Sequence, residues 1–224
     1  AAEVGLVNKR LGRRLRGDQA IAFDGEAGYQ ARLLMPGLRF KLWPVYSVTK
    51  HPWVQVSPGE IGVVIAQLGG PLPIGAKSAV YKAVFANFTD LDVFLSEGGQ
   101  KGIQRPVLPP GSLLPLHPLA FLVLTASRMY GVPISRGGRQ SAQTLDNLGL
   151  VPSQLQVTFI APQAERDVVG VVTTLEGYAP DAGDIASRLG GFQDIAALEK
   201  IDAPDAEKIE AILSSKNGLH NNYQ

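Results

Sequence analysis

The sequence contains no cysteine, which removes disulfide bonds, a thiolate nucleophile and cysteine-based zinc sites from consideration. Its three histidines, His51, His117 and His220, lie far apart. None has a second ligand type at the i+4 spacing of a helix or the i+2 spacing of a strand. We therefore expect no bound metal, no cofactor and no enzymatic activity.

A net charge of one sign and a long apolar segment are also missing. Lys and Arg total 21 against 20 for Asp and Glu, so the formal charge of +1 gives no general attraction for nucleic acid. The longest nearly uncharged apolar run, around 119–124, is far shorter than the roughly 20 residues that cross a bilayer as a helix. We expect no nucleic-acid partner and no membrane-spanning helix.

The composition is that of a folded protein, with 45% hydrophobic and 18% charged residues. The chain begins at Ala1 without a methionine and ends at Gln224 without a helix cap. These ends indicate a segment of a longer protein, from which an anchor or further domains are missing.

Three short stretches of the sequence resemble one another: residues 3–7, 60–64 and 167–172. In each stretch one glycine is followed seven residues later by a second, and five or six residues after that by a third. The second and third glycines of the three copies are Gly12 and Gly17, Gly69 and Gly75, and Gly177 and Gly183. Repeated spacing of this kind predicts tandem structural units with turns at these glycines.

The first two copies also end alike. Pro36-Gly37 and Pro110-Gly111 each precede a second proline by eight residues, and a β-rich run follows. The pattern therefore predicts that one unit is a pair of strands around a variable insert. We predict an α+β fold of β-rich subdomains with short amphipathic helical inserts: repeat one at 1–57, repeat two at 58–161, and a truncated, mostly helical third repeat at 162–224.

The helices are expected in the inserts. Residues 89–92 read as a capping box before a helix that buries Leu91, Phe94 and Leu95 and ends at Gly98-Gly99. A further helix is expected in the third repeat, after Pro204. The alternating run at 155–160 predicts a half-buried strand belonging to the second repeat.

The order of these features resembles the start of an SPFH (band 7, prohibitin-homology) domain. Gly37-Leu38-Arg39-Phe40 and Pro44-Val45 occupy the places of the family's Gly-(Leu/Thr)-His-Phe-type segment and its proline-containing strand, with Arg39 where histidine is common. Residues 59–125, including 73–77 and 99–111, also resemble bacterial flotillin-like SPFH proteins.

The resemblance implies a non-catalytic scaffold. Such a protein assembles into homo-oligomers at a membrane and organises lipid microdomains or partner membrane proteins, with the membrane contact and part of the assembly lying outside this segment. The full-length protein would be membrane-associated and this segment soluble, on an undetermined side of the membrane.

The most basic stretch supplies the candidate contact with lipid or a partner: Lys9, Arg10, Arg13, Arg14 and Arg16. Each such charge is worth about 1 kcal/mol near an anionic membrane surface. The other interpretation is a solvated turn. The corresponding positions of the other repeats, around 66–67 and 173–174, carry no charge, so the fold itself does not require the cluster.

Two alternatives to a scaffold remain open at this stage. A soluble ligand- or peptide-binding module would need a pocket with converging polar groups between the first two repeats. An enzyme would need paired acids in a cleft, for which Asp90 and Asp92 are the candidates. His117 takes the place of Trp43 in the repeat, which indicates a packing position rather than a catalytic one.

Overall fold

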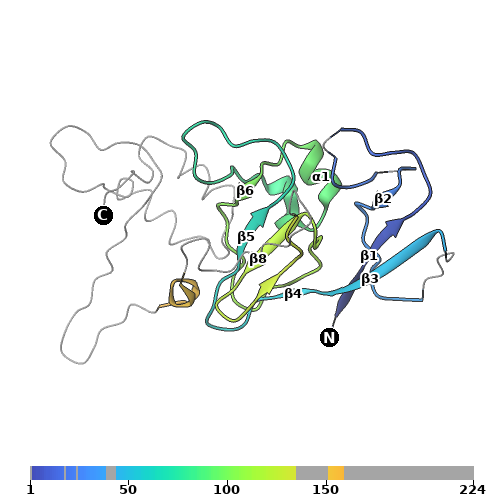
Figure 1. Ribbon diagram of the computed structural model, residues 1–224. Helices are drawn as coiled ribbons and strands as arrows, with labels where there is room; N and C mark the ends of the chain where they lie inside the picture. The colour runs from blue at the N-terminus through green and yellow to red at the C-terminus, as the bar shows by residue number, and fades with distance from the viewer. Residues whose placement is uncertain (1, 18, 24, 39–43, 135–150, 159–224) are drawn as a thin grey trace, which may run out of the picture.

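The computed structural model describes residues 2–17, 19–23, 25–38, 44–134 and 151–158 (Figure 1). Within these ranges the architecture is strand-rich with a few short helices, in agreement with the coarse α+β expectation. The predicted third repeat at 162–224, with its helices and with Gly177 and Gly183, lies outside the described residues, and so do Arg39, Phe40 and Trp43.

The first unit is a three-stranded antiparallel sheet. Strand β1 (Glu3–Lys9) lies in the middle, between β2 (Gly28–Tyr29) and β3 (Tyr46–Pro52). The β1–β3 ladder runs the full length of both strands, from the pair Glu3 and Pro52 to the pair Lys9 and Tyr46. The start and the end of the first repeat are therefore joined directly.

The second unit has the same arrangement with one strand more. Strand β5 (Val63–Ala66) lies between β6 (Gly102–Ile103) and β8 (Phe121–Leu124), and β9 (Met129–Tyr130) pairs with the other edge of β8. A small ladder of β4 (Val54–Gln55) with β7 (Leu113–Leu114) connects the two units. Figure 1 shows β4 continuing directly from β3 toward the second sheet.

The hydrogen bonds of the two units match position by position. Gly5 and Leu34 exchange both main-chain bonds, at 2.8 and 2.9 Å, and Gly62 and Leu108 exchange the same two bonds at 2.9 and 2.8 Å. In each case a glycine, within β1 in the first unit and directly before β5 in the second, bonds to the leucine two residues before Pro-Gly. A side chain on Gly62 would be 3.0 Å from Val56 and 3.2 Å from the Cβ of Leu108, so the close approach leaves little room for one.

A glutamine is repeated in the same way. Nε2 of Gln30 donates to the main-chain oxygens two and four residues before it, at 2.9 and 3.1 Å. Nε2 of Gln104 does the same at 3.0 and 2.9 Å. Each glutamine also donates its main-chain N–H to the first strand of its own unit, to Val7 at 2.8 Å and to Val64 at 2.9 Å. These two side chains hold the turn that precedes them against the sheet.

The insert of the second unit carries the helices η1 (Ala83–Phe88) and α1 (Leu91–Ser96), which pack an aromatic cluster onto the second sheet. Phe94 and Phe88 approach Phe121 of β8 with ring centroids 5.1 and 5.5 Å apart. Leu91 and Phe94 are buried as predicted. The cap differs from the prediction, because Asp90 rather than Thr89 begins the helix and accepts from the main chain of Asp92 and Val93.

The core is shared between the two units. Leu6, Ile21 and Ala31 of the first unit belong to the same buried cluster as the aromatic residues of the insert and the strand β8. A second, smaller cluster joins Val63, Leu124 and Leu155. Burial of this apolar surface stabilises the fold, and it fixes the two units relative to one another.

The predicted strand at 155–160 is wrong over the part that the structure describes. Pro152–Leu155 forms a 3-10 helix, η3, and Gln156 makes a single antiparallel bridge with Glu60. A proline at the start favours a helical turn, and Leu155 is buried by that turn rather than by alternation along a strand.

Three successive residues of η1 have left-handed backbone angles: Ala86 at φ 43°, Asn87 at φ 54° and Phe88 at φ 64°. Such angles cost non-glycine residues about 1–2 kcal/mol each. They are held by burial of Phe85 and Phe88 on either side of the bend and by the bond from Asn87 N–H to the Tyr81 hydroxyl, at 3.2 Å.

Ala86→Gly should therefore stabilise the protein. Ala86 is exposed, so no cavity forms, and we expect the free energy of unfolding to rise by about 0.5–1 kcal/mol in urea denaturation. Ala83→Gly is the matched control, because Ala83 lies in the same element without a positive φ. Ala83→Gly should be less stable than the parent by about 0.5–1 kcal/mol, because it gains unfolded-state freedom without relieving strain. A stability of Ala86→Gly equal to or below that of the parent would contradict this account.

Candidate functional site

The basic stretch forms a loop between β1 and β2. Lys9 is the last residue of β1 and is half-buried, while Arg10, Arg14 and Arg16 are exposed. The main chain of Arg13 is fixed by two hydrogen bonds, from its N–H to the oxygen of Gly25 at 3.1 Å and from the Ala27 N–H at 2.8 Å. The loop is thus built into the fold by its backbone while most of its arginine side chains face solvent.

The second unit has an equivalent loop whose matching positions carry no charge. Gly70 replaces Arg13 and makes the same two main-chain bonds, to the Gly99 oxygen and from the Lys101 N–H, both at 2.8 Å. The turns at the two tips match as well. Gln19 donates to the Arg16 oxygen at 3.1 Å, and Ala76 donates to the Pro73 oxygen at 3.1 Å. The loop geometry therefore does not depend on the arginines.

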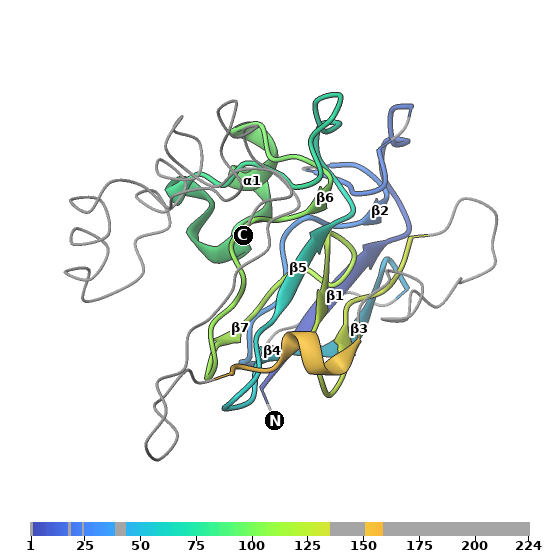
Figure 2. The same ribbon diagram turned by 90° about the vertical axis from the view of Figure 1, so that its left-hand side faces the viewer.

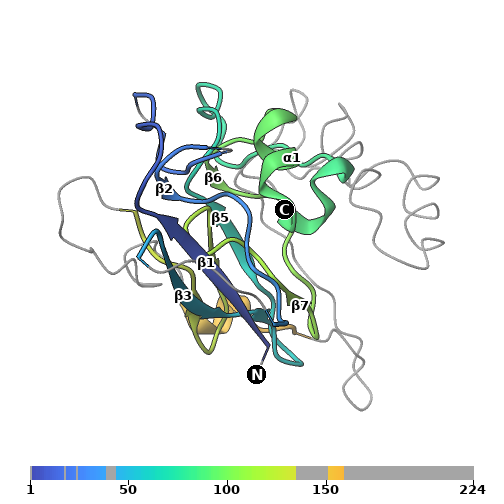
Figure 3. The ribbon, with the colours of Figure 1, turned by 90° about the vertical axis from the view of Figure 1, so that its right-hand side faces the viewer.

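The two loop tips project on the same side of the molecule (Figures 2 and 3). Arg16 is at the tip of the first loop, and Ile74 at the tip of the second is fully exposed. Leu11 is also 65% exposed beside the arginines. This side of the molecule combines positive charge with isolated apolar side chains.

The predicted turn glycines lie in these loops. A Cβ on Gly12 would be 2.8 Å from the Gly25 oxygen, and a Cβ on Gly69 would be 2.4 Å from the Gly99 oxygen. Gly17 and Gly75 have φ of +49° and +91° and occupy the tip turns. Gly12 and Gly69 permit the close contact of two backbones, and Gly17 and Gly75 permit a left-handed turn.

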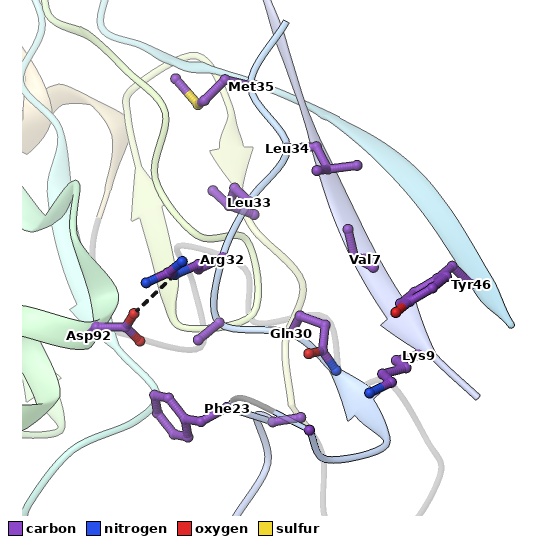
Figure 4. Close-up of a pocket in the computed structure, with 13 residues that line it drawn as sticks. Val7, Lys9, Phe23, Gln30, Arg32, Leu33, Leu34, Met35, Tyr46 and Asp92 are labelled. Atoms are coloured by element: carbon purple, nitrogen blue, oxygen red, sulfur yellow. Dashed lines mark ion pairs between the residues drawn. The ribbon is translucent and has the colours of Figure 1, made fainter. Parts of the chain in front are cut away.

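A pocket of about 420 Å³ lies beside the basic loop, at the junction of the two units (Figure 4). Its polar lining consists of Lys9, Gln30, Arg32 and Tyr46 from the first unit and Asp92 from helix α1. Nε of Arg32 is 3.8 Å from Oδ2 of Asp92, across the exposed rim. Apolar side chains, including Phe23, Leu33 and Met35, form the remaining wall.

His117 is buried at a junction of the main chain. Its Nε2 lies 3.1 Å from the Gln30 oxygen, and its Nδ1 accepts from the Ala120 N–H at 3.2 Å. These partners fit the neutral ring with the proton on Nε2. The pKa of His117 is lowered to about 4, mainly by burial and to a smaller extent by the nearby His51, while the hydrogen bonds with the main chain act in the opposite direction.

Glu60 is a buried acid that the sequence alone did not single out. Burial by itself would raise the pKa of Glu60, but hydrogen bonds from Ser57 and Ser127 outweigh it and lower the pKa. The bonds come from the Ser57 N–H, the Ser127 N–H and the Ser127 hydroxyl, each at 3.1 Å. The carboxylate thereby ties the start of the second unit to the turn between β8 and β9.

The two acids considered for catalysis do not form a paired site. Asp90 uses its Oδ1 as the N-terminal cap of α1, at 3.0 and 3.2 Å from two main-chain nitrogens. Asp92 points to Arg32 at the pocket rim. Within the part of the chain that the structure describes, no group of three His, Asp or Glu side chains could hold a metal ion. No helix in the same ranges is long and apolar enough to cross a bilayer.

Comparison of the chain with protein-family models, curated proteins and solved structures gives no match.

The pKa of His117 predicts loss of stability in mild acid. The ring gains its proton near pH 6.5 when the chain is unfolded but near pH 4 when it is folded, so the unfolded state binds more protons between these values. Lowering the pH from about 7.5 to about 5 should cost about 2 kcal/mol through this group.

His117→Gln should remove this part of the pH dependence, whatever it does to stability at neutral pH. The measurement is urea denaturation of parent and variant at both pH values. His51→Gln is the control and should retain the His117 contribution. An unchanged pH slope in His117→Gln would show that the ring is not neutral in the folded protein.

Proposed function

We propose that the chain is a non-catalytic scaffold segment of the SPFH or band 7 type. In this proposal its two described units are tandem SPFH-like subdomains. The protein assembles with further copies of itself at a membrane, where it organises lipids or partner membrane proteins. The basic loop of the first unit contacts anionic headgroups.

The observation that carries the proposal is the difference between two equivalent loops. The main-chain bonds of the loop are the same in both units, yet the exposed residues Arg10, Arg14 and Arg16 of the first loop correspond to uncharged positions of the second. The cation of the second loop, Lys77, follows its tip turn. Charges that the fold does not need are available for a partner. Three exposed arginines at a charged surface can contribute about 3 kcal/mol, or roughly a hundredfold in affinity.

The roles of three polar groups that bond to the main chain favour binding over catalysis. Glu60, His117 and Asp90 each bond to the main chain and hold segments of the fold in place. A general acid or base needs free access to a substrate proton. Among the described residues, Glu60 and His117 are engaged inside the structure instead, and Asp90 is engaged at the surface as the cap of α1.

The membrane contact predicts selective binding to anionic vesicles. The protein should sediment with phosphatidylcholine vesicles that contain phosphatidylserine and remain in solution with phosphatidylcholine alone. The triple variant Arg10→Gln, Arg14→Gln, Arg16→Gln should bind about a hundredfold more weakly, because it loses three surface charges. Binding should also fall with salt.

A variant with the same change in charge elsewhere is the control. Lys82→Gln, Lys101→Gln, Arg128→Gln removes three exposed cations of the second unit and should bind as the parent does. Equal weakening of vesicle binding by both triple variants would show that binding depends on net charge alone and not on the basic loop. No binding of the parent to anionic vesicles would refute a membrane contact through this loop.

The pocket between the units favours a second candidate, a soluble ligand-binding module. Its lining combines the cations Lys9 and Arg32 with apolar side chains and Phe23, which suits a small aromatic carboxylate. Asp92 partly offsets the positive charge. This candidate requires no membrane.

Titration with benzoate, followed by NMR, tests the second candidate. Saturable chemical-shift changes should appear at Arg32 and Gln30. The affinity for benzoate should fall about tenfold in Arg32→Gln, which loses a charge-assisted contact. Arg128→Gln is the control, since Arg128 stacks on Tyr130 outside the pocket. Absence of saturable shifts at these residues would argue against an aromatic carboxylate as ligand.

A further inference from the structure

The two units differ at one edge. Strand β8 of the second unit is paired on both sides, by β5 and by β9, whereas its equivalent β3 is an edge strand paired with β1 alone in the described sheet. The equivalence follows from the ladders. Tyr46 pairs with Lys9 and Phe121 pairs with Ala66, at matching positions of the two first strands. The first unit therefore lacks a counterpart of β9 among the described residues.

Exposure shows the same difference. Val48 of β3 is 45% exposed, whereas its equivalent Val123 in β8 is completely buried. Thr49 and Lys50 are exposed as well, and the residues equivalent to them, Leu124 and Thr125, are buried. Figure 3 shows β3 at the outer margin of the first sheet.

The outer edge of β3 carries main-chain groups ready for a further strand. The bonds from Arg10 N–H to the Val45 oxygen and from Trp53 N–H to the Ala2 oxygen show that the odd-numbered residues of β3 face β1. In an antiparallel pair, bonding alternates along the strand. The N–H and C=O of Val48 and Lys50 therefore point outward, away from β1.

Open space lies over the face of the sheet beside β3. Val48 and Lys50 line a shallow cavity of about 700 Å³ together with Leu34, Met35 and the start of β1. The strand is seven residues long and contains residue types that favour strands, such as Tyr46, Val48 and Thr49. Edges of this length are templates for pairing with another chain.

We propose that β3 pairs with β3 of a second copy of the chain, antiparallel and centred on Thr49. Val48 and Lys50 of one copy then exchange hydrogen bonds with Lys50 and Val48 of the other, four bonds in all, and a six-stranded sheet results. The arrangement is two-fold symmetric and closed. The proposal specifies the self-assembly part of the proposed function and rests on that part alone.

The charges of β3 are compatible with this register. Lys50 lies opposite Val48 of the other copy, so the two ammonium groups do not face one another. Nζ of Lys50 is also 3.7 Å from Oε2 of Glu3, which reduces the local positive charge. Moving the two-fold centre by one residue, which is a two-residue shift of register, would bring either Val48 or Lys50 opposite itself, and the second case opposes like charges.

Single cysteines test the register directly, because the chain has no cysteine of its own. Thr49 would meet itself at a non-hydrogen-bonded position, where Cα atoms are about 4.5 Å apart and a disulfide can form. Under mild oxidation, Thr49→Cys should convert to a covalent dimer at micromolar protein concentration. Val48→Cys and the exposed control Lys101→Cys should remain largely monomeric.

Val48→Pro is the second test. It removes an outward N–H while leaving the β1–β3 bonds intact, and proline is tolerated at such positions. Two N–H groups are lost per dimer, so the dimer dissociation constant should rise about 30-fold in analytical ultracentrifugation. Circular dichroism like that of the parent would show that the monomer still folds.

The outcomes separate this inference from the membrane contact. A parent chain that stays monomeric, or a Thr49→Cys variant that dimerises no faster than Lys101→Cys, overturns pairing through β3 even if vesicles are bound. Faster crosslinking through Val48→Cys overturns the register. Selective crosslinking through Thr49→Cys supports the inference even if the protein does not bind anionic vesicles.

Discussion

The pairing of β1 with β3 and of β5 with β8 is the interaction on which the rest of the structure depends. β1 with β3 and β5 with β8 bring together segments that are far apart in the chain. Loop closure has an entropic cost, which the ladder and the buried apolar side chains on it offset. Once these strands pair, Gly5 and Gly62 can approach the leucines before the Pro-Gly turns, and Gln30 and Gln104 hold the remaining loop.

The two units share main-chain bonds and differ where those bonds do not constrain them. The second copy has a helical insert, an additional strand and a buried β8. The first has a charged loop and an exposed β3. The differences between the copies therefore mark the surfaces on which function is proposed, and the similarities mark what folding needs.

Some of these features could be predicted from local sequence patterns. The glycine spacings place the turns at Gly12, Gly17, Gly69 and Gly75, because contacts between backbones and left-handed turns exclude a side chain. The apolar face of α1 was predicted for a similar reason, since helical spacing is a local property. The cap at Asp90 and the helical turn at 152–155 were missed, because neighbouring residues competed for the same local role.

The sequence by itself determined the matching glycine spacings, the turns at them and the basic stretch, all of which depend on short-range spacing and charge. Only the tertiary structure decided that Glu60 and His117 are buried and bonded, that a pocket opens between Arg32 and helix α1, and that β3 is an edge while β8 is not. Pairing partners and burial depend on residues distant in the chain. β3 and β8 have similar neighbours in sequence, and only the folded structure shows that β8 is covered while β3 is an edge.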